Sequence, residues 1–123
     1  EHAIETMKKM HKRGIRVLPG GDYGFAWTPH GTYARDLEYF VERLGFTPME
    51  AILAATKLGG QIMLQPDSLG QIRPGFMADL LLVKGNPLDD IRLLQDRSNL
   101  LMIMKGGVAH KAFGQPELRR AAA

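Results

Sequence analysis

The chain has 123 residues, of which 45% are hydrophobic and 24% charged, and this composition excludes an intrinsically disordered chain. No uncharged apolar run of about 18 residues is present to cross a membrane, and the lack of cysteine excludes disulfides and thiolate metal sites, so any metal must be bound by His, Asp or Glu. The net charge is +3, and because the basic residues are scattered except in the stretch 8–13, the sequence gives little support for nucleic-acid binding.

The sequence opens at Glu1 without a basic and apolar leader, so we expect no signal peptide. We expect the chain to be a piece of a larger protein. No sequence feature defines its compartment, and we favour the cytoplasm.

An amphipathic helix and a strand are predicted first. Within residues 1–13 the spacings of three and four between Ile4, Met7 and His11 place these residues on one face of a helix. Gly14 is expected to end this helix. The β-branched run at residues 15–18, which breaks at Pro19, predicts a strand. A helix followed directly by a strand is typical of a βαβ series and favours a parallel sheet.

A loop and two further helices are predicted next. Residues 22–32 show no helical or strand period and are interpreted as a loop. Apolar residues then recur at positions i, i+3, i+4 and i+7, which predicts a helix that ends at Gly45. These residues are Leu37, Phe40, Val41 and Leu44. Thr47-Pro48-Met49-Glu50 has the pattern of a helix N-terminus, so a third helix is predicted to about Leu58. We expect Gly59-Gly60 to end or kink it, with a short helical piece over 61–65.

The chain changes character near Pro66. Beyond it, three short strands are predicted at residues 71–72, 78–84 and 100–104, separated by Gly and Pro turns. We therefore divide the chain into an α/β part at residues 1–66, a small sheet at 67–113 and a tail at 114–123.

These elements do not make a complete fold by themselves. One parallel strand cannot form a sheet, and three or four short strands without a covering helix leave open edges and an open apolar face. Their partners must lie outside these 123 residues or in another copy of the chain. We expect the chain to expose apolar surface and to associate, as a homo-oligomer or through that surface.

Asp22 is the first candidate for chemistry. It follows the predicted strand directly, at the carboxyl end, where the loops of parallel α/β folds carry functional side chains. The alternative is an aspartate selected for a tight turn. The sequence alone leaves both interpretations open.

His30 lies in a loop rich in aromatic residues. This loop could line a substrate pocket, or its rings could simply pack on the protein, and the aromatic residues concerned are Tyr23, Phe25, Trp27 and Tyr33. The other histidines are isolated, at His2, His11 and His110. No dinucleotide fingerprint, phosphate loop, Gly-x-Ser-x-Gly elbow or cysteine nucleophile is present, so catalysis would depend on a metal or a carboxylate.

The order of several short motifs resembles the C-terminal part of an amidohydrolase-superfamily enzyme, of the group that includes imidazolonepropionase and Xaa-Pro dipeptidase-like hydrolases. The motifs are spread over residues 14–111. They are Gly20-Gly21-Asp22, Pro29-His30-Gly31, Thr47-Pro48-Met49-Glu50-Ala51, Ala54-Ala55-Thr56 with Gly59, Leu69-Gly70-Gln71-Ile72-Arg73-Pro74-Gly75, Ala78-Asp79-Leu80, Gly85-Asn86-Pro87-Leu88 and Met104-Lys105-Gly106-Gly107.

The resemblance implies a fold. Such enzymes join a (β/α)8 TIM barrel to a small β-sandwich. Residues 15–22 would then be the last barrel strand, residues 35–65 the helices after it, and residues 69–111 part of the sandwich. The missing strands would belong to the absent part of the protein.

The resemblance also implies a chemistry. Asp22 would bind a divalent metal, zinc or a similar ion, and take the proton of the attacking water during hydrolysis of a small amide or peptide substrate. His30, Tyr23 and Trp27 would contact the substrate, and Asp79 would be structural. The family's other metal ligands, including a His-x-His pair, have no counterpart here, so this chain alone cannot complete a metal site.

Three interpretations of function follow. The chain is part of a metal-dependent hydrolase acting on a C–N bond, inactive when alone, or it is a non-catalytic structural or interaction module that keeps the same scaffold. The third is a basic α/β domain that binds nucleic acid, which predicts steep salt dependence.

Overall fold

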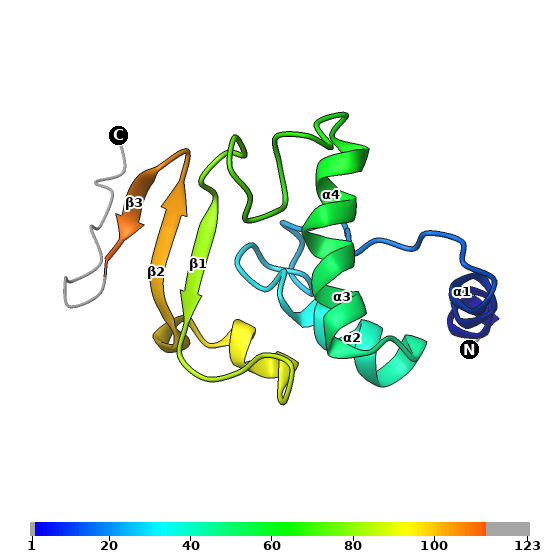
Figure 1. Cartoon of the computed structure of the whole chain (residues 1–123). Coiled ribbons are helices and arrows are strands. Elements are labelled where there is room, and N and C mark those ends of the chain that lie inside the picture. Colours follow the sequence, from blue (N-terminus) through cyan, green and yellow to red (C-terminus); the bar gives the residue numbers. More distant parts are fainter. Residues whose placement is uncertain (1, 113–123) are drawn as a thin grey trace.

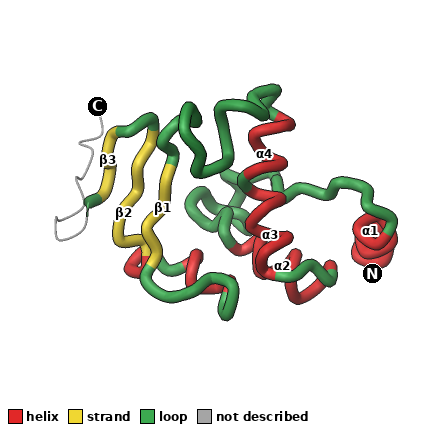
Figure 2. Tube along the Cα trace, viewed as in Figure 1, coloured by secondary structure: helices red, strands yellow, loops and turns green. Residues whose placement is uncertain are grey.

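Within residues 2–112, which the computed structural model describes, four α-helices precede a sheet of three strands (Figures 1 and 2). The expected tail at 114–123 lies outside the described residues. The elements are α1 (His2–Lys12), α2 (Arg35–Leu44), α3 (Pro48–Ala55), α4 (Lys57–Ile62), β1 (Leu80–Val83), β2 (Leu100–Lys105) and β3 (Val108–Lys111), with 3-10 helices η1 (Ile91–Gln95) and η2 (Arg97–Asn99) between β1 and β2.

Helix α2 forms where its apolar period predicted it. Leu37, Phe40 and Leu44 lie on one face and are buried. The helix ends at Gly45, whose left-handed φ of 80° lets its amide return to the Phe40 carbonyl. Phe46 follows and packs its ring 4.8 Å from that of Phe40, so the end of the helix also closes the core.

Helix α3 begins with the predicted capping box. The Thr47 hydroxyl accepts a hydrogen bond from the Glu50 amide at 3.2 Å, and the Glu50 carboxylate accepts one from the Thr47 amide at 2.8 Å. These bonds from the amide and then the hydroxyl of Thr47 lower the pKa of the Glu50 carboxyl. Pro48 fills the first turn, where no amide donor is needed.

Substitution Thr47→Ala is expected to lower the free energy of unfolding by about 1 kcal/mol, because the first turn of α3 loses its hydroxyl acceptor. Thr6→Ala is the matched control, since Thr6 lies inside exposed α1 and bonds only the His2 carbonyl within its own helix. Alanine is favourable there. Urea unfolding of both variants measures the difference, and equal losses would contradict the capping role.

The sequence predicted that Gly59-Gly60 would end or kink the third helix, but the break between α3 and α4 lies elsewhere. It falls at Thr56, and both glycines lie inside α4. A Cβ on Gly60 would lie 2.5 Å from the Leu69 carbonyl oxygen, so this glycine lets the returning chain approach the helix closely. A tertiary contact therefore explains Gly60, one of the two glycines that looked like a local stop.

The sheet is antiparallel, in the order β1-β2-β3. In its register Leu80 pairs with Met104, and Lys105 pairs with Val108 across the Gly106-Gly107 turn. The predicted strands at 78–84 and 100–104 are confirmed, although β3 was not predicted. The predicted strand at 71–72 is wrong: it lies among turns, with Ile72 88% exposed.

Asp79 holds the hairpin turn from outside the sheet. Its carboxylate accepts a hydrogen bond from the Gly106 amide at 2.7 Å, and the neighbouring Ala78 carbonyl accepts one from the Gly107 amide at 3.1 Å. The structure thus gives Asp79 a structural contact, in agreement with the sequence interpretation.

The predicted parallel strand at residues 15–18 does not form in this chain. This segment is irregular, and the strands described within residues 2–112 are all antiparallel, so it has no parallel neighbour to bond. Instead, the Ile15 amide donates a hydrogen bond to the Met10 carbonyl. The Arg16 guanidinium donates one to the Gln61 side-chain oxygen at 2.8 Å, and Val17 packs against the core.

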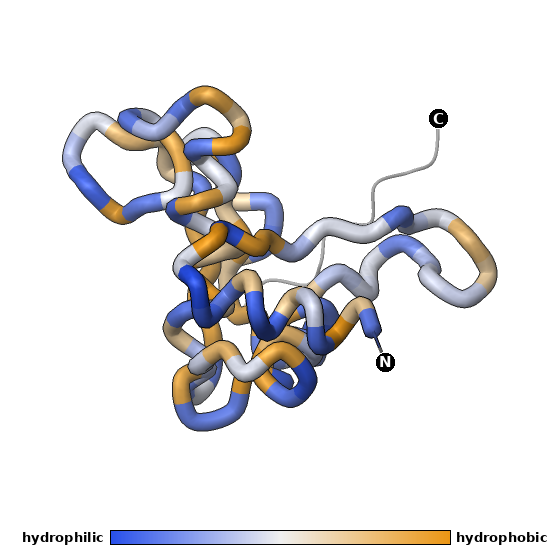
Figure 3. Tube along the Cα trace, turned by 90° about the vertical axis from the view of Figure 1, so that its right-hand side faces the viewer, coloured by the Kyte–Doolittle hydropathy of each residue, from blue (hydrophilic) through white to orange (hydrophobic). Residues whose placement is uncertain are grey.

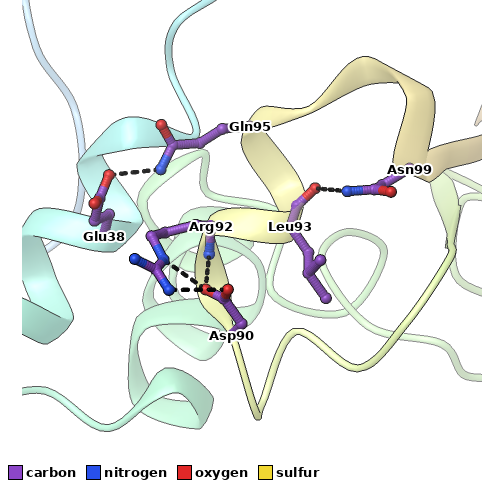
Figure 4. A network of polar contacts seen from close by, with 6 residues as sticks. All are labelled: Glu38, Asp90, Arg92, Leu93, Gln95 and Asn99. Carbon is purple, nitrogen blue, oxygen red and sulfur yellow. Dashed lines mark hydrogen bonds and ion pairs between the residues drawn. The ribbon is translucent and has the colours of Figure 1, made fainter.

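The buried core is small and lies mostly in the helical part. Its members in the described chain are Leu37, Phe40, Leu44, Phe46, Ala51, Ala54 and Ile91. Ile91 brings η1 onto α2, and the Gln95 side-chain amide donates to the Glu38 carboxylate across the same junction at 2.7 Å (Figure 4). In Figure 4 the Arg92 guanidinium also binds Asp90, and this lowers the pKa of that carboxyl.

Many large apolar side chains remain exposed. Leu64 is 88% exposed, and hydrophobic residues occur on outlying turns of the trace as well as at its centre (Figure 3). The chain therefore has an α/β fold with a three-stranded antiparallel sheet whose apolar surface is only partly covered. None of the helices in the described part is long and apolar enough to span a membrane.

Candidate functional site

The loop that carries the candidate residues is closed by backbone hydrogen bonds. The Gly24 amide donates to the Thr28 carbonyl at 2.8 Å, and the Thr28 amide donates to the Phe25 carbonyl at 3.0 Å. The Thr28 hydroxyl also donates to the Asp22 carbonyl at 2.8 Å. A tight turn therefore follows Asp22 and fixes the backbone of that residue. It lies within the loop predicted at residues 22–32.

Asp22 lies at the end of the irregular segment 15–21, with its side chain exposed. Its main-chain carbonyl is bonded by Thr28, whereas its carboxylate has no hydrogen bond or ion pair within residues 2–112. An unpaired carboxylate on a fixed backbone is available to bind a cation or to accept a proton.

His30 and Tyr23 meet through Tyr33. The Tyr33 hydroxyl lies 2.7 Å from His30 Nδ1, and the Tyr33 ring packs edge-on against Tyr23 with centroids 4.4 Å apart. Partial burial of Tyr23, and then its interaction with the nearby Asp36 carboxylate, raise the pKa of the Tyr23 phenol to about 12. The phenol of Tyr23 is therefore neutral throughout the physiological range.

Trp27 lies apart from this group, at the tip of the tight turn. Its ring stacks on Phe25 with centroids 5.4 Å apart and planes 7° from parallel. Trp27 is 74% exposed and Phe25 51%. The structure thus brings together two of the three predicted substrate-contacting residues and places the third on a separate aromatic pair.

Sequence reasoning named Tyr33 only as one of the loop aromatics that could line a pocket, and it gave Asp36 no site role. The aromatic content of the loop pointed toward Tyr33, but its contact with His30 depends on the turn at residues 30–33. Asp36 resembled an ordinary acidic residue in the first turn of α2, where it favours the helix dipole. Nothing in the sequence pattern distinguishes it from Glu38 on the same helix.

A hollow of about 490 Å3 lies beside the segment that leads to Asp22. Its lining includes Leu18, Tyr23, Tyr33 and Asp36, together with residues of α3 and α4. A second hollow of about 510 Å3 is lined by Val17, Leu18 and the first two helices. The segment therefore borders two hollows.

The described residues do not form a metal site on their own. No group of three or more His, Asp or Glu side chains in residues 2–112 is placed to hold a metal ion. The carboxylate of Asp22 has the donor chemistry of one ligand to a divalent cation. The remaining ligands would have to come from elsewhere in a longer protein.

The chain is similar in sequence to known proteins. The family model described as "Amidohydrolase family" matches residues 1–109. Ochratoxinase from Aspergillus niger is 36% identical over 105 residues, which are 84% of this chain and 21% of that protein. The chain thus spans about a fifth of the length of the curated relatives that it matches.

Solved structures agree with the sequence match. The crystal structure of A. niger ochratoxinase has a TM-score of 0.82 at 33% identity, covering 93% of this chain and 26% of that chain. A putative prolidase from Bifidobacterium longum has a TM-score of 0.82 at 30% identity, covering 96% and 28%. A Xaa-Pro dipeptidase with methionine bound in its active site has a TM-score of 0.77 at 34% identity, covering 89% and 25%.

Proposed function

The chain belongs to the amidohydrolase family, and from this premise we propose that it is the C-terminal part of a metal-dependent hydrolase that cleaves an amide, peptide or cyclic C–N bond. The membership confirms the family predicted from the motif order. Relatives named as ochratoxinase, prolidase and Xaa-Pro dipeptidase support hydrolysis of amide or peptide bonds at the level of the family.

The proposal includes a place for this chain in the whole enzyme. Residues 1–66 are the end of a (β/α)8 barrel, with residues 15–22 as its last strand, and residues 67–113 are part of a β-sandwich. The two hollows beside Leu18 support this assignment, because they leave space along the segment that other parts of a barrel would fill. The same segment would then become hydrogen-bonded in the whole protein.

Asp22 is the proposed metal ligand and proton acceptor. The single observation that carries this role is an exposed carboxylate, unpaired within residues 2–112, on a backbone fixed by Thr28. When bound, a divalent metal such as zinc lowers the pKa of water to about 7 and polarises the substrate carbonyl. Asp22 accepts the proton of the attacking water and passes it to the leaving nitrogen as the C–N bond breaks.

The loop supplies the proposed substrate contacts. His30 offers an imidazole hydrogen bond, and Trp27 offers an exposed indole for apolar contact. Tyr23 lines the hollow as a neutral phenol near the Asp36 carboxylate. These groups fit a small amide or peptide that has both an apolar part and polar acceptor atoms.

The partly covered apolar surface supports a further part of the proposal, association. Exposed large hydrophobic side chains occur on helices, turns and the sheet alike, for example at Met7, Leu64 and Leu81. Such surface is normally buried against other protein. The covering surface is the rest of the polypeptide in the whole enzyme, or other copies when this chain is alone.

Removal of metal tests the proposed function. The full-length protein that carries this sequence is incubated with Xaa-Pro dipeptides and N-acyl amino acids, before and after dialysis against a chelator. We expect hydrolysis to disappear with the metal and to return on addition of Zn²⁺, because the ion both activates water and polarises the carbonyl. Metal content measured on the same samples is the control, and full hydrolysis by metal-free protein would refute the proposal.

A further inference from the structure

Tyr33 makes the one hydrogen bond to His30 that the structure shows in residues 2–112, at 2.7 Å between the Tyr33 hydroxyl and His30 Nδ1. A neutral imidazole has one donor and one acceptor nitrogen, and the bond made at one nitrogen decides which of them carries the proton. The phenol oxygen is a weak acceptor because its lone pair is delocalised into the ring, whereas an unprotonated imidazole nitrogen is a strong acceptor. Donation by the hydroxyl to Nδ1 is therefore the favoured arrangement, and it places the imidazole proton on Nε2.

The other edge of the imidazole lies over Gly24. A Cβ built on Gly24 would come 2.9 Å from His30 Nε2, closer than to any other imidazole atom. Gly24 has a φ of 108°, which a residue with a side chain rarely adopts. The loop thus reserves this space for the imidazole, with Nε2 beside a residue only two positions after Asp22.

Tyr33 is itself held in place by the aromatic group. Its ring packs edge-on against Tyr23, and both rings line a hollow together with Asp36 and Leu37 of α2. Asp36 is positioned by a rigid helix whose Leu37 and Phe40 are buried in the core. The orientation of His30 is therefore linked to the helical core through two tyrosines.

We propose that Tyr33 is a positioning residue for His30, which it holds with Nε2–H directed to donate a hydrogen bond to an oxygen of the bound amide substrate. This inference rests on the proposed function, in which His30 contacts the substrate. It adds the chemical nature of that contact: His30 is a donor, so the group it recognises is an acceptor, the amide carbonyl or a carboxylate of the substrate.

The test uses the full-length protein with ¹⁵N-labelled histidine. NMR of the wild type is expected to show His30 with an unprotonated Nδ1 and a protonated Nε2, its signals being assigned by their loss in His30→Gln. In Tyr33→Phe, which keeps the ring but lacks the hydroxyl, we expect a mixture of tautomers. A wild-type His30 protonated on Nδ1, or a tautomer unchanged in Tyr33→Phe, would overturn the proposal.

Kinetics supply the second readout. Tyr33→Phe is expected to raise KM by about 3- to 10-fold, the range expected for loss of one hydrogen bond, and to change kcat less. Tyr39→Phe is the matched control: Tyr39 lies on α2 under the Arg35 and Arg43 guanidinium groups, at 5.7 and 5.2 Å, and should change neither KM nor the tautomer. An unchanged KM in Tyr33→Phe would refute the substrate contact.

Two substrates identify the acceptor. A dipeptide is compared with its C-terminal amide: an effect of Tyr33→Phe on both assigns the bond to the scissile carbonyl, and an effect on the free acid alone assigns it to the carboxylate. A protein that hydrolyses no amide, but whose His30 tautomer still depends on Tyr33, would refute the proposed function while supporting the positioning by Tyr33.

Discussion

Substitution Asp22→Asn in the full-length protein is expected to lower kcat by at least about 100-fold. Asparagine keeps the shape of the side chain and leaves the Thr28 bond to the Asp22 carbonyl intact, because that bond uses the main chain. It cannot, however, accept a proton from water, and as a neutral group it is a weaker ligand for a divalent cation. Loss of activity without loss of fold is therefore expected.

The measurement is kcat on the best substrate, together with metal content and a circular dichroism spectrum. Asp67→Asn is the matched control, because Asp67 is also an exposed aspartate but lies in the turn after α4. It should leave kcat unchanged. If Asp22→Asn retains full activity, the carboxylate is a turn residue, and its proposed role in the reaction is wrong.

Substitution Gly70→Ala is expected to lower the free energy of unfolding by about 3 kcal/mol or more. A Cβ at this position would overlap the Thr56 carbonyl group, and the backbone has a left-handed φ of 81°. Thr56 joins α3 to α4, so the chain can relieve the overlap only by separating the loop from this helix junction. The steric overlap and the left-handed backbone conformation therefore both destabilise this variant.

Gly75→Ala separates the two penalties. Gly75 has nearly the same φ, 84°, but an added Cβ would meet nothing within 4 Å. We expect this control to cost only about 1–2 kcal/mol, the conformational part alone. Urea unfolding followed by circular dichroism compares the variants, and equal losses would show that the close approach of Gly70 to Thr56 contributes nothing to stability.

The parts of the fold that were predictable are those with local causes. Helix α2 follows from the spacing of Leu37, Phe40 and Leu44, and α3 follows from the hydrogen-bonding groups of Thr47 and Glu50 within one turn. Strand β2 follows from a short apolar run between turns. In each case the residues that decide the structure lie within a few positions of each other, so the pattern alone is sufficient.

The errors have non-local causes. The segment 15–18 has the composition of a strand, but strand bonding depends on neighbours that this chain does not provide. Gly60 lies inside α4 because a later part of the chain, at Leu69, approaches the helix there, and the local sequence does not show this contact. Strand β3 carries little apolar signal of its own and forms because the Gly106-Gly107 turn brings it to β2.

The candidate site divides in the same way. The position of Asp22 after an apolar run and the aromatic character of the following loop were visible in the sequence. The pairing of Tyr33 with His30 and of Tyr23 with Asp36 was not, because each depends on how the loop folds back on the start of α2. Sequence reasoning therefore identified the loop but not the internal contacts that orient its side chains.

The distribution of the core has a consequence for folding kinetics. Six of the seven buried hydrophobic side chains of the described chain lie between Leu37 and Ala54, and only Ile91 is distant from them along the chain. Contacts between near neighbours close small loops and form fast, whereas distant pairings form slowly. We therefore expect α2 and α3 to dock as an early nucleus, and the pairing of β1 with β2, whose residues lie far apart along the chain, to form in a later, slower phase.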